Sequence, residues 1–163
     1  MTSLSLLPID AGDLAFVGEM LRVAAFWRDD SEAPSVADLL RQPDLAVYLD
    51  GWGRPGDAGL VAHVDGEPIG AVWVRRFRDD AHGYGYLDPE TPELSIAVAE
   101  GHRGCGLGGC LLTAMLVELR LRGVARVSLS VEDDNPARAL YERLGFVPVR
   151  AADGVTTMVC TVG

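Results

Sequence analysis

The chain has 163 residues, of which 48% are hydrophobic, and this length and apolar content predict one domain with a sizeable core over residues 1–163. Its formal net charge of -10 disfavours nucleic acid as a partner, because phosphate backbones are bound by basic surfaces. All 14 basic residues are arginines, so the lysine with which a P-loop reaches its phosphates is missing.

The first half of the chain predicts two helices and an antiparallel meander. Apolar residues recur at helical spacing between Leu14 and Ala24, and Asp65-Gly66 is a turn signal between two apolar runs. The expected elements are a strand at 4–8, helices at 10–27 and 35–41, and strands at 60–64, 69–77 and 93–98.

In the second half, helices alternate with strands. A Gly-rich loop at 101–109 opens a helix, and a later helix stops at Gly145, a residue type common at helix C-termini. The expected elements are a helix ending near residue 122, a strand at 126–131, a helix at 136–144 and strands at 147–150 and 156–161. Together, the elements of both halves predict an α/β fold with a mixed sheet.

Signals for export, membrane insertion and metal binding are missing from the sequence. Pro8 and Asp10 interrupt the first apolar stretch, which no basic segment precedes, and no apolar run approaches the length of a membrane span. The three cysteines and three histidines lack the paired spacings of disulfide frameworks and metal sites. We therefore expect a cytoplasmic protein without a bound metal.

The strongest chemical signal is the segment from Val98 to Gly109, which reads VAEGHRGCGLGG. Glycines let the backbone turn tightly and approach a ligand closely. The helix that follows offers free N–H groups and the positive end of its dipole. This combination suits a diphosphate, although glycines also serve as plain turns.

A dinucleotide-binding pattern competes for the same loop. Gly104, Gly106 and Gly109 satisfy the fingerprint G-x-G-x-x-G, and Glu132 stands about where a ribose-binding acid belongs. Against it, several residues separate Val98 from the first glycine, whereas the dinucleotide turn follows its strand almost directly. An NAD-binding oxidoreductase stays as an alternative.

Three motifs together resemble the GNAT superfamily of N-acetyltransferases. They are ELSIAV at 93–98, Arg103-x-x-Gly106-x-Gly108, and NPARALYERLGF at 135–146, in the family's order. The resemblance implies a mostly antiparallel central sheet flanked by helices, with a splayed strand pair for the cofactor. It also implies that an acetyl group passes from acetyl-CoA to a primary amine of a small molecule or peptide.

The resemblance assigns residues to the coenzyme. Backbone N–H groups of the loop would hold the pyrophosphate, and the strand before it would pair with the pantetheine arm. The implied residues are Ile96, Ala97, Val98, Arg103, Gly104, Cys105, Gly106, Leu107, Gly108, Gly109, Asn135 and Tyr141. Because Asn135 precedes a proline, it equally predicts a helix N-cap, and both roles stay open.

Tyr141 and Glu93 are the implied catalytic residues. Tyr141 would protonate the leaving thiolate, although its apolar helical stripe with Leu140 and Leu144 equally predicts a core aromatic. An amine of pKa about 10 is neutral only about one part in a thousand at pH 7, so a general base has something to gain. Glu93 would be this base if its pKa were raised or a water relayed the proton; a solvated strand-end residue is the alternative.

The acceptor is expected beside the first helices and the loop before Glu93. The candidates are Trp27, Asp30, Tyr84 and Tyr86, because aromatic rings beside carboxylates suit a small cationic amine. As ordinary helix-end and loop residues they would need no function. A non-catalytic acyl-CoA-binding module is the main alternative to an enzyme, and a homodimer, common in the superfamily, is compatible with the resemblance.

Overall fold

One seven-stranded sheet, in the order β1-β2-β3-β4-β5-β7-β6, organises the computed structural model, which describes residues 2–29 and 31–163. Its strands are β1 (Leu4–Pro8), β2 (Ala58–Val64), β3 (Glu67–Arg75), β4 (Glu93–Val98), β5 (Arg126–Glu132), β6 (Val147–Ala152) and β7 (Val155–Thr161). All neighbouring strands are antiparallel except β4 and β5. The mixed, mostly antiparallel sheet predicted from the sequence is confirmed.

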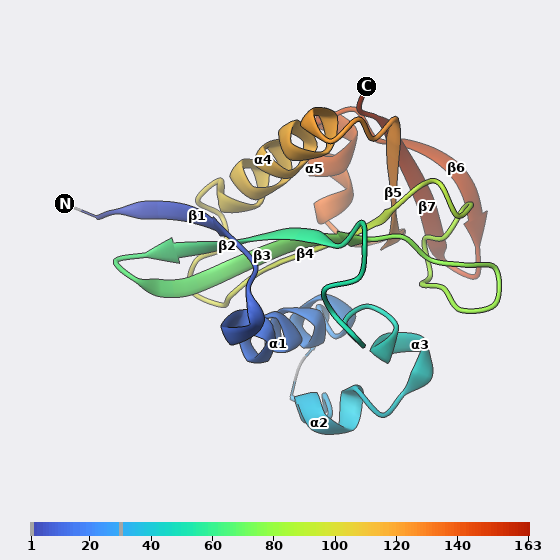
Figure 1. Ribbon diagram of the computed structural model, residues 1–163. Coiled ribbons are helices and arrows are strands. Elements are labelled where there is room, and N and C mark those ends of the chain that lie inside the picture. The colour runs from blue at the N-terminus through green and yellow to red at the C-terminus, as the bar shows by residue number, and fades with distance from the viewer. Residues whose placement is uncertain (1, 30) are drawn as a thin grey trace.

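Helices cover both faces of the sheet (Figure 1). On one face lie α1 (Leu14–Ala25), α2 (Val36–Leu39) and α3 (Pro43–Ala46), and on the other lie α4 (Leu107–Leu121) and α5 (Ala137–Arg143). Each layer buries its own apolar cluster, with Val17 and Leu21 of α1 in one and Leu111 and Met115 of α4 in the other. Removing this apolar surface from water is the main stabilising contribution to the fold.

The predicted helix at 10–27 is shorter in the structure. Asp10 accepts a hydrogen bond from the Gly12 N–H, and Asp13 accepts one from the Asp10 N–H, so this reciprocal cap encloses a 3-10 turn at Ala11–Asp13. The α-helix begins only at Leu14. The sequence analysis missed α3, a four-residue helix with Pro43 in its first turn, because one turn is too short to show a helical period.

Strands β4 and β5 touch at one end and then separate. Their only register pair is Glu93 with Ser128, where the Ser128 N–H donates to the Pro92 carbonyl at 3.0 Å. Beyond this point the edge of β4 has no strand partner, whereas its other edge pairs with β3 along its whole length. The expected splayed strand pair is confirmed.

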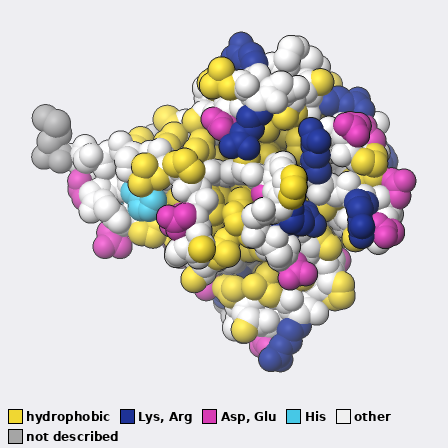
Figure 2. Space-filling view, in the orientation of Figure 1, with side chains coloured by type: hydrophobic (Ala, Val, Ile, Leu, Met, Phe, Trp, Pro, Cys, Tyr) yellow, Lys and Arg dark blue, Asp and Glu magenta, His cyan; other side chains and the backbone are white. Residues whose placement is uncertain are grey.

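The face seen in Figure 2 carries both signs of charge, with Asp and Glu side chains standing among the arginines. The acidic excess of the chain is therefore partly offset on this face by neighbouring arginines.

Candidate active site

A cavity of about 700 Å³ occupies the opening between β4 and β5. At one end, which we call the loop end, it is lined by Arg103, Gly108 and Asn135. At the other, the Glu93 end, Glu93 is joined by Tyr48 and Tyr84. Six residues of β4 separate the two ends, a distance of roughly 17 Å along a strand.

Unused backbone donors are concentrated at the loop end. In the described part of the chain, no N–H from Arg103 to Gly109 donates a hydrogen bond to a protein group, and the Cys110 N–H is the first to bond, to the Gly106 carbonyl. Gly106 caps α4 in the left-handed conformation with φ of 85°, which few other residue types tolerate. Seven consecutive donors at the start of a fifteen-residue helix form a site suited to an anion.

Two guanidinium groups lie near these donors. Arg28 and Arg103 line a second cavity of about 220 Å³, together with the acidic residues Asp29 and Glu100. The Arg103 Nε donates to the Val98 carbonyl at 3.2 Å, which holds the loop against the end of β4. The predicted residues Ile96, Ala97 and Val98 of β4 line the main cavity, whereas Gly104, Cys105, Gly106, Leu107 and Gly109 lie in the adjoining loop and first helical turn.

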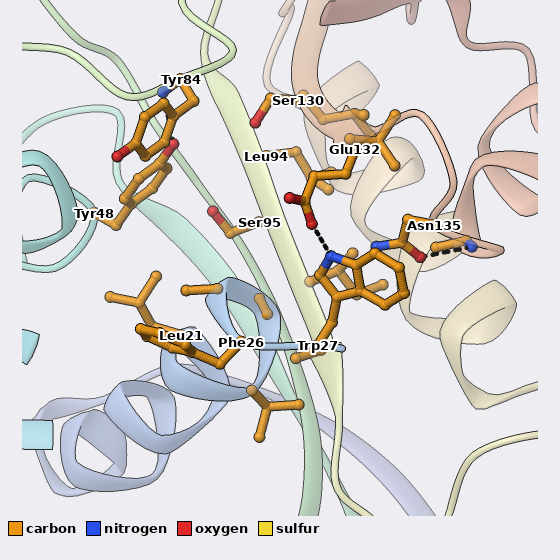
Figure 3. A pocket seen from close by; sticks show the side chains of 18 of the residues that line it. Leu21, Phe26, Trp27, Tyr48, Tyr84, Leu94, Ser95, Ser130, Glu132 and Asn135 are labelled. Atoms are coloured by element: carbon orange, nitrogen blue, oxygen red, sulfur yellow. Dashed lines mark hydrogen bonds between the residues drawn. The ribbon is translucent and has the colours of Figure 1, made fainter. Parts of the chain in front are cut away.

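Asn135 serves as a cap and also lines the cavity. Its Oδ1 accepts a hydrogen bond from the N–H of Ala137, the first residue of α5, at 2.9 Å, as drawn in Figure 3. The N-cap position itself is Pro136, one residue later than predicted, but the predicted bond from Asn135 to the helix start is present. Because this bond uses only the side-chain oxygen, the amide nitrogen of Asn135 stays available as a donor.

Tyr141 is buried on α5 and also lines the cavity. Its ring packs against Phe146 with centroids 5.9 Å apart, and burial raises the pKa of its hydroxyl to about 12. No hydrogen bond joins this hydroxyl to another described residue. Tyr141 is therefore a core aromatic that also borders the cavity, and its role at the leaving sulfur stays a prediction.

A hydrogen-bonded chain of three residues forms the Glu93 end. The Tyr48 hydroxyl donates to Glu93 Oε2 at 2.6 Å and accepts from the Tyr84 backbone N–H at 2.8 Å. Glu93 is only 3% exposed, and its burial raises its pKa to about 7, although the Tyr48 hydrogen bond acts in the opposite direction. Its Oε1 makes no hydrogen bond to a described residue. The buried environment supplies the raised pKa that the sequence analysis required of a base.

Two of the predicted acceptor residues line the cavity. The Trp27 Nε1 donates to Glu132, which links the end of α1 to the end of β5, and the Tyr84 hydroxyl donates to Asp44 (Figure 3 shows Tyr48 and Tyr84 together, with Trp27 beside Glu132 and Asn135). Tyr86 does not line this cavity. Its ring stacks on His82 and its hydroxyl donates to Asp79. Asp30 lies outside the described residues.

Tyr48 was not predicted as a site residue, and Glu132 was considered only in the dinucleotide-binding alternative. Tyr48 follows α3, a helix too short to show the 3.6-residue repeat of apolar side chains, so no local sequence pattern indicated a role for it. The mostly antiparallel sheet excludes the dinucleotide-binding fold, which needs parallel strands on both sides of its ligand.

The described residues contain neither a metal-ligand cluster nor a membrane-spanning helix. Within residues 2–29 and 31–163, no three or more His, Cys, Asp or Glu side chains come together as ligands for a metal ion. No helix in the same residues has both the length and the apolar character needed to cross a bilayer.

Solved structures share the fold across nearly the whole chain. The PaiA N-acetyltransferase from Thermoplasma acidophilum, in complex with coenzyme A, aligns over 98% of this chain and 99% of its own, with a TM-score of 0.72 and 15% identity. The ribosomal-protein-alanine N-acetyltransferase from Brucella melitensis aligns over 96% and 99%, with a TM-score of 0.70 and 23% identity.

Curated relatives match by sequence. A mycothiol acetyltransferase from Corynebacterium aurimucosum is 40% identical over 104 residues, which is 63% of this chain and 31% of that protein. The [ribosomal protein bS18]-alanine N-acetyltransferase of Haemophilus influenzae is 39% identical over 57 residues, 35% of this chain and 39% of its own length. The matches thus span about a third of the length of these relatives. The model of the acetyltransferase (GNAT) family matches residues 23–146, and with the shared fold this shows that the chain belongs to the GNAT acetyltransferase family.

Proposed function

We propose that this protein transfers an acetyl group from acetyl-CoA to a primary amine of a small molecule or peptide. The observation that carries the proposal is the continuous cavity, which runs from Arg103 and Gly108, two members of the run of seven unused backbone N–H groups, to the buried carboxyl of Glu93. An anion site and a proton acceptor at opposite ends of one cavity are what this reaction needs.

The loop end fits the coenzyme. The N–H groups of Arg103 to Gly109, with the helix dipole behind them, would bind the pyrophosphate, and Arg103 would add positive charge beside it, whereas Arg28 is paired with Asp134. The unpaired edge of β4 at Ile96–Val98 would take the pantetheine arm as an added strand, and the amide nitrogen of Asn135 would donate to it. The PaiA relative, which has the same fold, was solved with coenzyme A.

The Glu93 end fits an amine. Deprotonating an amine of pKa about 10 at pH 7 costs roughly 4 kcal/mol, and a base with a pKa of about 7 is better matched to this task than an ordinary carboxylate. Glu93 would take one proton from the ammonium form. The neutral nitrogen then attacks the thioester carbonyl, so that a C–N bond forms and the C–S bond breaks. Coenzyme A leaves as a thiolate, and the nitrogen releases its second proton to water as the amide forms.

Tyr141 would act on the departing sulfur. Because the pKa of its hydroxyl is about 12, complete proton transfer to a thiolate of ordinary pKa, about 8.5, would be uphill by roughly 5 kcal/mol. A hydrogen bond from the hydroxyl to the sulfur stabilises the developing charge without that transfer, and burial beside Tyr141 also raises the pKa of the sulfur.

Carboxylates and aromatic rings at the cavity suit a cationic acceptor. Asp44 and Glu132 line it beside Tyr84 and Trp27, and two of the relatives are named for acetylating mycothiol and a ribosomal protein alanine. An amine that carries a positive charge is therefore the proposed acceptor class. A cytoplasmic location and a homodimer remain predictions.

Thiol release from acetyl-CoA, followed with and without a panel of cationic, neutral and anionic amines, tests the proposal. We expect release that depends on a cationic amine and is lost in Glu93→Gln. Binding of acetyl-CoA without amine-dependent release would instead favour the non-catalytic module. Failure to bind acetyl-CoA would contradict both.

A further inference from the structure

The Tyr48 backbone is fixed by two residues of β3. The Trp73 Nε1 donates to the Tyr48 carbonyl at 3.2 Å, and the Arg75 Nη1 donates to the carbonyl of Val47 at 2.9 Å. Arg75 in turn forms an ion pair with Asp57 at 3.0 Å, and both side chains are almost fully buried. Breaking such a buried pair is costly, so the sheet holds the segment after α3 in one place.

The Tyr48 hydroxyl has one recorded acceptor for its proton. Its oxygen accepts from the Tyr84 N–H, which can only donate, and among the described residues Glu93 Oε2 is the one acceptor to which its proton is donated. When Glu93 takes up a proton, that proton therefore belongs on Oε1. This oxygen is buried and has no hydrogen-bond partner among the described residues, so a water molecule or a proton of its own can satisfy it.

We propose that Tyr48 is a positioning residue for Glu93, which occupies Oε2 and leaves Oε1 as the oxygen that receives the proton released by the acceptor. The proposal rests on the proposed function, since it assigns an atom and a partner to the same base. The proton leaves the ammonium nitrogen of the acceptor and, because Oε1 is buried, reaches it through a water molecule. An O–H bond forms at Oε1, while the Tyr48 O–H bond stays intact.

Several groups besides Tyr48 act on Glu93. His82 of the loop after β3 and Arg150 of β6 favour the ionised carboxylate by their charge, as does the nearby backbone N–H of Gly85, while burial favours the protonated form. Gly83 packs so closely that an added Cβ would lie 2.4 Å from the Tyr48 hydroxyl and 2.6 Å from Glu93 Oε1. Removing the Tyr48 hydroxyl thus removes one of the contacts that hold the carboxylate ionised.

Infrared spectra recorded across pH 5 to 9 test this without requiring activity. Subtracting the Glu93→Gln spectra isolates the signal of the Glu93 carboxyl group. The pH midpoint of its titration is then compared between the parent protein and Tyr48→Phe. We expect Tyr48→Phe to move the midpoint upward by about one pH unit, because a hydrogen bond to a charged group has been lost. The acidic limb of kcat/KM should move with it.

Two further variants distinguish a specific effect of the Tyr48 contact from a general disturbance near Glu93. Thr91→Val removes a buried hydroxyl that bonds Arg126 and Asp88, only two residues before Glu93, and should leave the Glu93 midpoint in place. Gly83→Ala crowds both the Tyr48 hydroxyl and Glu93 Oε1 without deleting either, and should shift the midpoint in the same direction as Tyr48→Phe. Equal midpoints in the parent protein and Tyr48→Phe would overturn the proposal. A shifted midpoint in a protein without acetyl transfer would support the Tyr48–Glu93 pairing and contradict the proposed function instead.

Discussion

The two ends of the cavity present different kinds of groups. The loop end offers backbone N–H groups from seven consecutive residues, with few side chains beside them. The Glu93 end depends on side chains from three separate segments, since Tyr48 follows α3, Tyr84 lies in the loop after β3, and Glu93 begins β4. A backbone site can be encoded in one short stretch of sequence, whereas a side-chain site requires the fold to bring its parts together.

This contrast predicts that changes at the two ends have separable effects. A side-chain change near the chemistry should alter turnover or titration while coenzyme affinity stays the same. A change in backbone conformation at the loop should alter coenzyme affinity and leave the pH dependence of the rate unchanged.

The largest expected effect is that of Tyr141→Phe on turnover. If its hydroxyl stabilises the departing sulfur by a hydrogen bond, kcat should fall by about 10² to 10³-fold. The ring packing against Phe146 is retained, so the Kd of acetyl-CoA should stay within about twofold of the parent value. An unchanged single-turnover rate would remove Tyr141 from the chemistry and leave it as a core aromatic.

Glu93→Gln should change how stability depends on pH. The folded pKa of Glu93 is about 7, above its value of about 4.3 in the unfolded chain, so the folded state holds this proton more tightly. Its contribution to stability is therefore complete below about pH 4.3 and is lost as pH rises through about 7.

Denaturant unfolding at pH 5 and pH 8 measures this loss. Between these values the parent protein should lose roughly 3 kcal/mol of unfolding free energy relative to Glu93→Gln. If the free energies of unfolding of the parent protein and Glu93→Gln differ by the same amount at both pH values, Glu93 is not buried as described.

The smallest effect is expected at the loop end. Gly106→Val disfavours the left-handed conformation that caps α4 and should raise the Kd of acetyl-CoA about tenfold. Gly123→Val is the matched control, since Gly123 also has positive φ and open space around it but follows the far end of α4. Calorimetry that shows equal affinity losses in both variants would mean that strain alone, not the loop, explains the effect.

The sequence predicted the features that depend on neighbouring residues. The Gly-rich loop, the helix it opens and the bounds of β4 were all visible locally, because glycine spacing and alternation are properties of short segments. Tyr48 was not, since its role depends on Trp73, Arg75 and Glu93 at least 25 residues away. Tyr86 shows the converse, an aromatic residue in the expected loop that packs on His82 outside the cavity.

The central claim is that the free N–H groups from Arg103 to Gly109 hold the pyrophosphate of the coenzyme. An amide-resolved NMR titration with coenzyme A, compared with pantetheine, tests it most directly. The account predicts large shifts of these amides with coenzyme A and small ones with pantetheine, which lacks the pyrophosphate. Saturable coenzyme binding that leaves those amides unmoved would contradict it.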